Sequence, residues 1–250
     1  MLLAEIHGKS YRGIEDLEDL LTSAVFGHLR LVQPPGFWSA LLGRARTVDE
    51  PSRTLAQILS SVGIDAAKFS EVQVRFWGYF PGYGEPDLLV HLFGNNVASI
   101  TILIEVKLHA GKSGIGEFDQ LARYLALLND PACLLGWPCD FDKRFLVYLT
   151  RNFSANELHA SIAESKTLNA ESRMFGLEWN DIAEIASEQR QCNKLLGEVA
   201  DFLRRRGFER FHGFSFAPTP HTFAGHFYQR RYFEQVESRG IRTDGRFYGR

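Results

Sequence analysis

The stretch PDLLVHLFGNNVASITILIEVK, residues 86–107, decides the fold of this chain. Apolar and β-branched residues fill most of 87–93 and of 99–108, as is typical of strands. Gly94-Asn95-Asn96 between them has the residue types of a tight turn. The pattern therefore predicts two antiparallel strands joined as a hairpin.

The register of this hairpin is expected to bring two acids together. With the turn centred on 95–97, opposed residues have numbers that sum to about 192, as Asp87 and Glu105 do. Opposed side chains lie about 5 Å apart at Cβ, where two carboxylates repel each other unless a cation lies between them. Carboxylate oxygens of this kind suit Mg²⁺, which one or two carboxylates hold together with waters and substrate phosphate.

A lysine completes the pattern. Side chains alternate along a strand, so Lys107 shares the face of Glu105, whereas Val106 points to the other. Its ammonium could orient or deprotonate a water, or stabilise charge on phosphorus. An acid-x-Lys triplet alone is expected by chance, and Glu164-Ser165-Lys166 is a second one in a polar stretch. The specificity lies in its combination with Pro86-Asp87 and the register; the alternative is a surface hairpin with an incidental ion pair.

Around the hairpin, periodicity predicts an α/β chain. Apolar residues at helical spacing, with start and stop signals, indicate helices, and short apolar or alternating runs indicate strands. Helices are expected over 13–32, 52–62 (capped by Ser52), 117–128 and 180–206, and further strands over 71–80, 144–150 and 173–179.

Three motifs together resemble the PD-(D/E)xK nuclease superfamily, which has the restriction-endonuclease-like fold. They are Pro86-Asp87, Glu105-Val106-Lys107 and Gln120-Leu121-Ala122-Arg123-Tyr124. The resemblance covers about residues 14–150 and implies an αβββαβ core, a central mixed sheet flanked by helices.

The resemblance also implies a ligand set. Asp87 and Glu105 would bind Mg²⁺ or Mn²⁺, the carbonyl of Val106 would be a further ligand, and Lys107 would assist the attacking water. Family members often carry another acid on the first core helix. Glu18 is the candidate, and Glu15 is the alternative because it lies one turn earlier on nearly the same face.

Residues after the hairpin are expected to approach the substrate. By the resemblance, Gln120 and Tyr124, four apart on one helical face, would lie near the substrate or metal-bound waters. The alternative is a core Tyr124 beside a solvated Gln120. Arg123 would contact phosphate or only solvent. Lys112, in the glycine-rich loop 111–116, is expected to touch the phosphate backbone, although the spacing of that loop excludes a nucleotide-binding loop.

Charge is distributed unevenly. The chain carries a net charge of −2, but residues 201–250 contain ten Arg and five acids, or +5, which leaves −7 for residues 1–200. Such acidity argues against strong non-specific DNA binding, so binding is expected to rely on the C-terminal arginines, on a partner protein or on a homodimer. We expect a nuclease-like domain over 1–206 and an Arg- and aromatic-rich appendage, 207–250, whose phenylalanines pack on it. The alternative is an appendage that stacks on single strands.

Composition excludes several classes. Apolar residues are 45% and charged residues 23%, which is ordinary for a globular chain rather than a disordered one. No apolar run reaches the ~18 residues of a membrane helix, and no export signal is recognisable, so we expect no membrane partner. Three sparse cysteines argue against a disulfide framework and favour a cytoplasmic location.

The sequence therefore predicts a divalent-metal-dependent nuclease that hydrolyses DNA phosphodiester bonds. The alternative from another class is a catalytically silent nuclease-fold module that binds or scaffolds within a larger defence or repair complex. Its binding function alone would give no physical reason to keep Asp87, Glu105 and Lys107. Hydrolysis of RNA or of small phosphodiesters is a third hypothesis.

Overall fold

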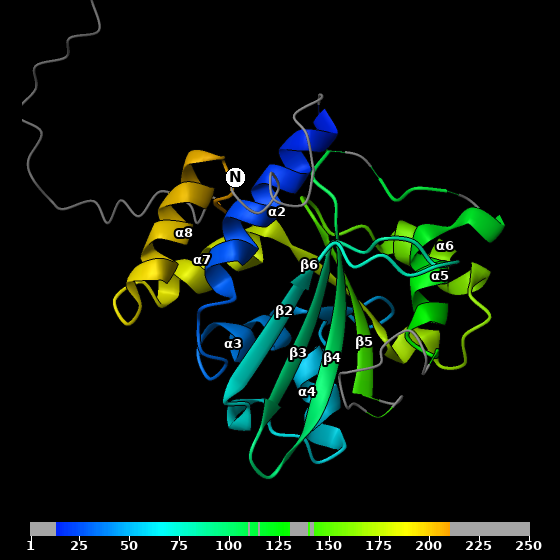
Figure 1. Ribbon diagram of the computed structural model, residues 1–250, viewed down its shortest axis with the longest axis horizontal. Coiled ribbons are helices and arrows are strands. Elements are labelled where there is room, and N and C mark those ends of the chain that lie inside the picture. Colours follow the sequence, from blue (N-terminus) through cyan, green and yellow to red (C-terminus); the bar gives the residue numbers. More distant parts are fainter. Residues whose placement is uncertain (1–13, 110, 115, 131–139, 141–142, 211–250) are drawn as a thin grey trace, which may run out of the picture. The chain divides into compact units, whose positions relative to one another are not determined.

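The computed structural model describes residues 14–109, 111–114, 116–130, 140 and 143–210, with only the backbone for 14–17 and 117. These residues belong to one compact unit that ends at Arg210. Its elements form an α/β fold with a six-stranded mixed sheet (Figure 1). The strands are β1 (Arg46–Thr47), β2 (Glu71–Phe76), β3 (Leu88–Gly94), β4 (Val97–Val106), β5 (Arg144–Thr150) and β6 (Met174–Glu178).

Seven α-helices accompany the sheet within the described residues. They are α2 (Ile14–Leu29), α3 (Phe37–Arg44), α4 (Leu55–Ser61), α5 (Gln120–Leu127), α6 (Ala155–Glu164), α7 (Trp179–Glu188) and α8 (Lys194–Arg205). Short 3₁₀ turns are η1 (Ala66–Lys68), η2 (Gly116–Phe118) and η4 (Ala170–Ser172).

The strand order is β1-β6-β5-β4-β3-β2. Strands β2, β3 and β4 form an antiparallel meander, whereas β4, β5 and β6 run parallel and β1 is antiparallel to β6. Parallel neighbours require crossover connections, and the connections from β4 to β5 and from β5 to β6 contain α5 and α6. The carboxyl ends of β4, β5 and β6 therefore lie at one edge of the sheet.

The two faces of the sheet bury separate apolar cores. Even-numbered residues of β3 and β4, such as Val90 and Ile102, pack with α2, α3, α4, α7 and α8. Odd-numbered residues, such as Leu89 and Leu103, pack with α5 and α6. Figure 1 shows the same division, with α5 and α6 on one side and α3, α7 and α8 on the other. Strands buried on both faces explain the near-continuous apolar runs of the sequence.

The predicted hairpin register is confirmed. Leu88 pairs with Ile104 and Leu89 with Leu103, so paired numbers sum to 192. The register shifts between Leu92 and Gly94, and the turn closes with Asn96 in the left-handed region at a φ of 61°. Asn tolerates this conformation better than most side chains, which is why Asn-Asn serves as turn chemistry here.

Several predicted boundaries were wrong. The single helix expected over 180–206 is two helices, α7 and α8, and the Asn193 side chain caps the second by accepting the N–H of Leu195 at 2.9 Å. The cap of α4 is Thr54 rather than Ser52. Strand β2 ends at Phe76 because Trp77 adopts a φ of 46°.

The predictions missed helices α3 and α6, and the appendage lies mostly outside the described residues. Its first residues, 207–210, continue the compact unit, and the Phe208 ring packs 5.7 Å from that of Trp179. The described unit therefore extends to Arg210, and the expected division at 206 stays a prediction. Residues 211–250, with most of the predicted aromatic and arginine side chains, are outside the described part.

Candidate active site

The acids of the hairpin meet where β3 begins and β4 ends. Asp87 directly precedes β3, and Glu105 is the penultimate residue of β4. Asp87 Oδ2 accepts the backbone N–H of Val106 at 2.8 Å, which ties the acid to the end of the neighbouring strand. Both side chains are buried, with 8% of Asp87 and 1% of Glu105 exposed. The hairpin thus holds two carboxylates in a region of little solvent.

Lys107 links the strand acids to the first helix. Its Nζ lies 2.9 Å from Glu105 Oε1 and 3.2 Å from Glu18 Oε1. Glu18 Oε2 accepts the backbone N–H of Leu108 at 2.7 Å, so α2 is fastened to the chain just after β4. The structure therefore brings together Asp87, Glu105, Lys107 and Glu18, which we call the carboxylate–lysine cluster. Glu15 lies where only the backbone is described.

Burial and mutual repulsion disfavour the ionised carboxylates. Burial raises the pKa of Asp87 to about 6, although Lys107 and the Val106 N–H act in the opposite direction. Burial and then the charge of Asp87 raise the pKa of Glu105 well above its ordinary value, against the attraction of Lys107. One ammonium is therefore too little positive charge for this set of acids.

Lys107 responds in the opposite sense. Burial lowers the pKa of its ammonium, but the charges of Glu105, Glu18 and Asp87 outweigh burial and raise the pKa above its ordinary value. The side chain is thus a charged hydrogen-bond donor in this arrangement. The prediction that it could deprotonate a water is not supported here, whereas orienting a water or stabilising charge agrees with the geometry.

The donor set suits a hard divalent cation. Glu105 Oε2 is buried and makes no hydrogen bond within the described structure, so an anionic oxygen is left for a further cation. With all groups ionised, the three carboxylates and one ammonium carry a net charge of −2, which a divalent ion would neutralise.

The carboxylates of the cluster do not form a complete metal-binding site in this structure. Across the described ranges, no group of three or more His, Cys, Asp or Glu side chains is placed to hold a metal. Both oxygens of Glu18 are engaged, by Lys107 and by the Leu108 N–H. Asp87 and Glu105 are therefore the residues that suit a divalent cation here, and direct ligation by Glu18 or by the Val106 carbonyl stays a prediction.

Helix α5 adds polar groups over the same face of the sheet. Gln120 Nε2 donates to the Tyr124 hydroxyl at 3.0 Å, and Gln120 Oε1 is buried without a partner in the described structure. Burial and then the charge of Glu105 raise the pKa of Tyr124, with a further contribution from Asp87, so this hydroxyl lies in the field of the cluster. The Gln120–Tyr124 pair thus lies near the acids, and Tyr124 is also buried in the apolar core beside α5 and α6, as the alternative expected. A contact of the pair with substrate stays a prediction.

The side chains of Arg123 and Lys112 differ in how they are engaged. Arg123 Nε is buried and lacks a hydrogen bond to any described residue, and its predicted contact with phosphate stays a prediction. Lys112 Nζ instead forms an ion pair with Asp119 and donates to Ser161 Oγ at 2.7 Å. Asp119 is buried and caps α5 through the N–H of Ala122. Lys112 therefore braces α5 against α6, which corrects the expectation that its ammonium is presented to phosphate.

Sequence reasoning missed a cavity beside Lys107. It has a volume of about 200 Å³ and extends past the carboxyl ends of β4 and β5 to the start of α6. Tyr148, which pairs with Glu105 across β4 and β5, lines it and donates its hydroxyl to Glu157 Oε2 at 2.9 Å. The lining comes from two segments, 107–111 and 148–157, that are far apart in the sequence, so no local motif predicts it.

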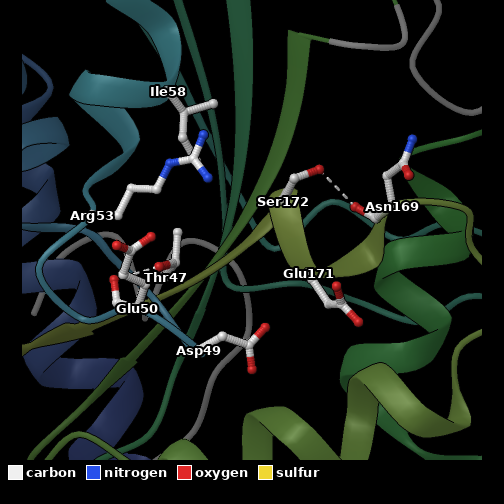
Figure 2. Close-up of a pocket in the computed structure, with 8 residues that line it drawn as sticks. All are labelled: Thr47, Asp49, Glu50, Arg53, Ile58, Asn169, Glu171 and Ser172. Atoms are coloured by element: carbon white, nitrogen blue, oxygen red, sulfur yellow. Dashed lines mark hydrogen bonds between the residues drawn. The ribbon is translucent and has the colours of Figure 1, made fainter. Parts of the chain in front are cut away.

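A second cavity, of about 210 Å³, lies at the other end of β6 (Figure 2). It is lined by Thr47, Asp49, Glu50, Arg53, Ile58, Asn169, Glu171 and Ser172. Because η4 leads into the first residue of β6, this cavity is separate from the carboxylate–lysine cluster at the carboxyl edge.

Comparison with known proteins gives no assignment: no family model matches the chain, and no curated protein or solved structure matches it either. Among the described helices, none combines the length and the apolar character needed to cross a membrane.

Proposed function

We propose that this chain is a divalent-metal-dependent nuclease of the PD-(D/E)xK type that hydrolyses DNA phosphodiester bonds. The observation that carries the proposal is the carboxylate–lysine cluster, with a buried oxygen of Glu105 left unpartnered. The chain order supports it, since α2, β2, β3, β4, α5 and β5 follow one another as in an αβββαβ core, with α3, β1 and α4 inserted between α2 and β2.

Asp87 and Glu105 are the residues that would hold Mg²⁺ or Mn²⁺. When bound, such an ion polarises the phosphate and lowers the pKa of a coordinated water. Their burial keeps competing water away and strengthens each electrostatic contact. Both acids have raised pKa values, so they give up protons as the site becomes competent.

Lys107 would act on the substrate as an ammonium. Its hydrogen bonds to Glu105 and Glu18 fix its position beside the acids. From there it can donate to the attacking water or to a non-bridging phosphate oxygen as negative charge develops. Glu18 acts through Lys107 and the Leu108 N–H, and is thus a positioning residue in this proposal. The unpartnered amide oxygen of Gln120 is available to orient a water.

The test is metal-dependent cleavage. Plasmid, linear DNA and RNA are incubated with the protein in Mg²⁺ or Mn²⁺, with EDTA as the blank and Lys107→Ala and Asp87→Asn as variants. We expect cleavage of DNA that requires metal and falls by about 100-fold or more in each variant. The matched control is Lys68→Ala, which removes the same type of charge at an exposed residue of η1, before β2.

Absence of metal-dependent cleavage, or equal cleavage by wild type and both variants, would refute the proposal. Binding of DNA without cleavage would instead support a nuclease-fold binding or scaffolding module. Faster cleavage of RNA than of DNA would change the substrate class and keep the chemistry.

A further inference from the structure

The cavity beside Lys107 continues the proposed active site along the carboxyl edge of the sheet. We call it the Arg151 groove; its lining includes Lys107, His109, Tyr148, Arg151, Ser154 and Glu157. Lys107 belongs both to this lining and to the carboxylate–lysine cluster. A substrate strand whose scissile phosphate lies at the cluster therefore has this groove directly beside it.

Arg151 is the cation of the groove that forms no ion pair with a described carboxylate. It is exposed, and no ion pair joins it to a carboxylate within the described residues. Its guanidinium lies over the ring of Phe208, 5.3 Å from the centroid. Such a cation–π contact holds the guanidinium near the ring and uses none of its N–H donors, which stay available to a ligand. A planar set of donors suits the oxygens of a phosphate.

The start of α6 adds donors to the same space. Ser154 is the N-cap residue of α6, but its hydroxyl makes no capping hydrogen bond. The first backbone N–H groups of a helix lack partners within the helix, and together with the helix dipole they favour an anion. Glu157 is the one acid of the lining, and its Oε2 is already engaged by the Tyr148 hydroxyl. Glu157 keeps its negative charge, but Lys107 and Arg151 give the lining two cations against this one acid, and that balance favours an anion.

The second cavity provides an internal comparison. Its volume is nearly the same, yet Figure 2 shows the carboxylates of Asp49, Glu50 and Glu171 around it with the single guanidinium of Arg53. Like charges would repel an anion there. Size alone does not distinguish the two cavities, whereas the sign of the charge does.

We propose that the Arg151 groove binds a backbone phosphate of the substrate strand next to the scissile phosphodiester. The substrate class is then a polynucleotide strand with at least one neighbouring phosphate rather than a small phosphodiester. This inference rests on the proposed function, because it extends the same site along the strand.

The test compares Arg151→Ala with Arg53→Ala, a matched arginine of the second cavity. Binding of a fluorescein-labelled single strand of about 12 nucleotides is measured by anisotropy in EDTA, across a salt series. We expect Arg151→Ala to weaken binding about fivefold or more and to reduce the salt slope by about one, with Arg151→Lys intermediate. Arg53→Ala should bind as the wild type does.

Catalysis gives a second readout. Cleavage of the same strand and hydrolysis of bis(p-nitrophenyl) phosphate, which has a single phosphate, are measured in Mn²⁺. Arg151→Ala should lose about tenfold more kcat/KM on the strand than on the small ester, mainly through KM. Thermal midpoints of all variants identify any loss that arises from unfolding, since the Phe208 stack is also removed.

The outcomes separate the two proposals. Loss of strand affinity in Arg151→Ala, but no metal-dependent hydrolysis of either substrate by the wild type, would refute the nuclease and retain the groove. Equal binding by wild type and Arg151→Ala, equal losses in Arg151→Ala and Arg53→Ala, or equal losses on strand and small ester would each overturn the groove. So would a wild type that binds no strand.

Discussion

Replacing Asp87 by Asn is expected to stabilise the metal-free protein near pH 8 even though it removes a proposed catalytic group. Burial raises the pKa of Asp87 from 3.8 to about 6, so the folded state resists its ionisation. A shift of this size corresponds to about 3 kcal/mol against the ionised form at high pH. Asn has nearly the same shape and can still accept the Val106 N–H through its amide oxygen, so the hydrogen bond is retained.

The sign of the effect depends on pH. Above about pH 6, Asp87 is ionised in both the folded and the unfolded protein, and the full penalty applies. As the pH falls from about 6 toward 3.8, the folded protein binds a proton that the unfolded chain does not hold, and the wild type gains stability relative to the variant. Below 3.8 both states are protonated, and the difference vanishes.

The measurement is urea unfolding in EDTA at a series of pH values between about 4 and 8. Asp87→Asn should exceed the wild type by about 2–3 kcal/mol near pH 8, and the gap should close toward pH 4. Asp49→Asn, at an exposed aspartate, should change stability by less than about 0.5 kcal/mol. A variant that is less stable than the wild type near pH 8, or a gap that does not narrow with falling pH, would refute the reasoning.

Three further outcomes are expected. DNA cleavage at limiting Mg²⁺ should rise with pH at about 6 or above, because Asp87 and Glu105 both have raised pKa values and must both lose their protons to bind metal. Saturating Mg²⁺ should move the rise to lower pH; initial rates at two metal concentrations test this, and a rise that does not depend on metal concentration would contradict it. Glu18→Gln should lower kcat about tenfold or more without weakening oligonucleotide binding, since Lys107 loses one of its two anionic partners; an unchanged kcat would remove Glu18 from the site. Asp119→Ala should destabilise the protein by about 3 kcal/mol in urea unfolding, because α5 loses its cap and the Lys112 ammonium its partner, and an effect below about 1 kcal/mol would show that this brace is unimportant.

The hairpin was predictable because its signals are local. The turn residues lie beside the strands that they join, and the pairings from Leu92 to Leu88 have the register counted from the turn, although the register shifts between Leu92 and Gly94. The same holds for β5, whose seven residues are buried throughout and whose central residues, 145–149, form a continuous apolar run. Register alone therefore places Asp87 opposite the end of β4.

The helices that sequence reasoning missed have weaker local signals. Pro34, Pro35 and Gly36 were interpreted as the end of the first helix, but Gly36 is also the residue from which α3 begins. In α6 the fully buried side chains are Leu158 and Ser161, which is too little to show an apolar stripe. The break between α7 and α8 depends on a cap by Asn193, which resembles any polar residue of a helix surface.

The partners of Lys112 could not be read from the sequence. A lysine in a glycine-rich loop suggests solvent and phosphate, and Asp119 seven residues later suggests only a helix cap. The decisive contact with Ser161 comes from α6, which reaches this loop only after β5 has been added to the sheet. Contacts between segments that the crossover connections bring together depend on topology, which a single sequence specifies only indirectly.

The charge balance of the cluster makes the structural role of Lys107 compatible with its proposed catalytic role. In the metal-free protein its ammonium is the counter-ion of buried Glu105 and of Glu18, and these ion pairs offset part of the free-energy cost of burying the carboxylates. Three acids can therefore lie together although the described side chains form no metal site. A divalent ion at Asp87 and Glu105 would supply the missing positive charge and weaken the attraction of Glu105 for the ammonium. The ammonium would then be available to the phosphate at the moment that the metal site is filled. In the proposed mechanism, the stabilising and the catalytic use of Lys107 thus succeed each other.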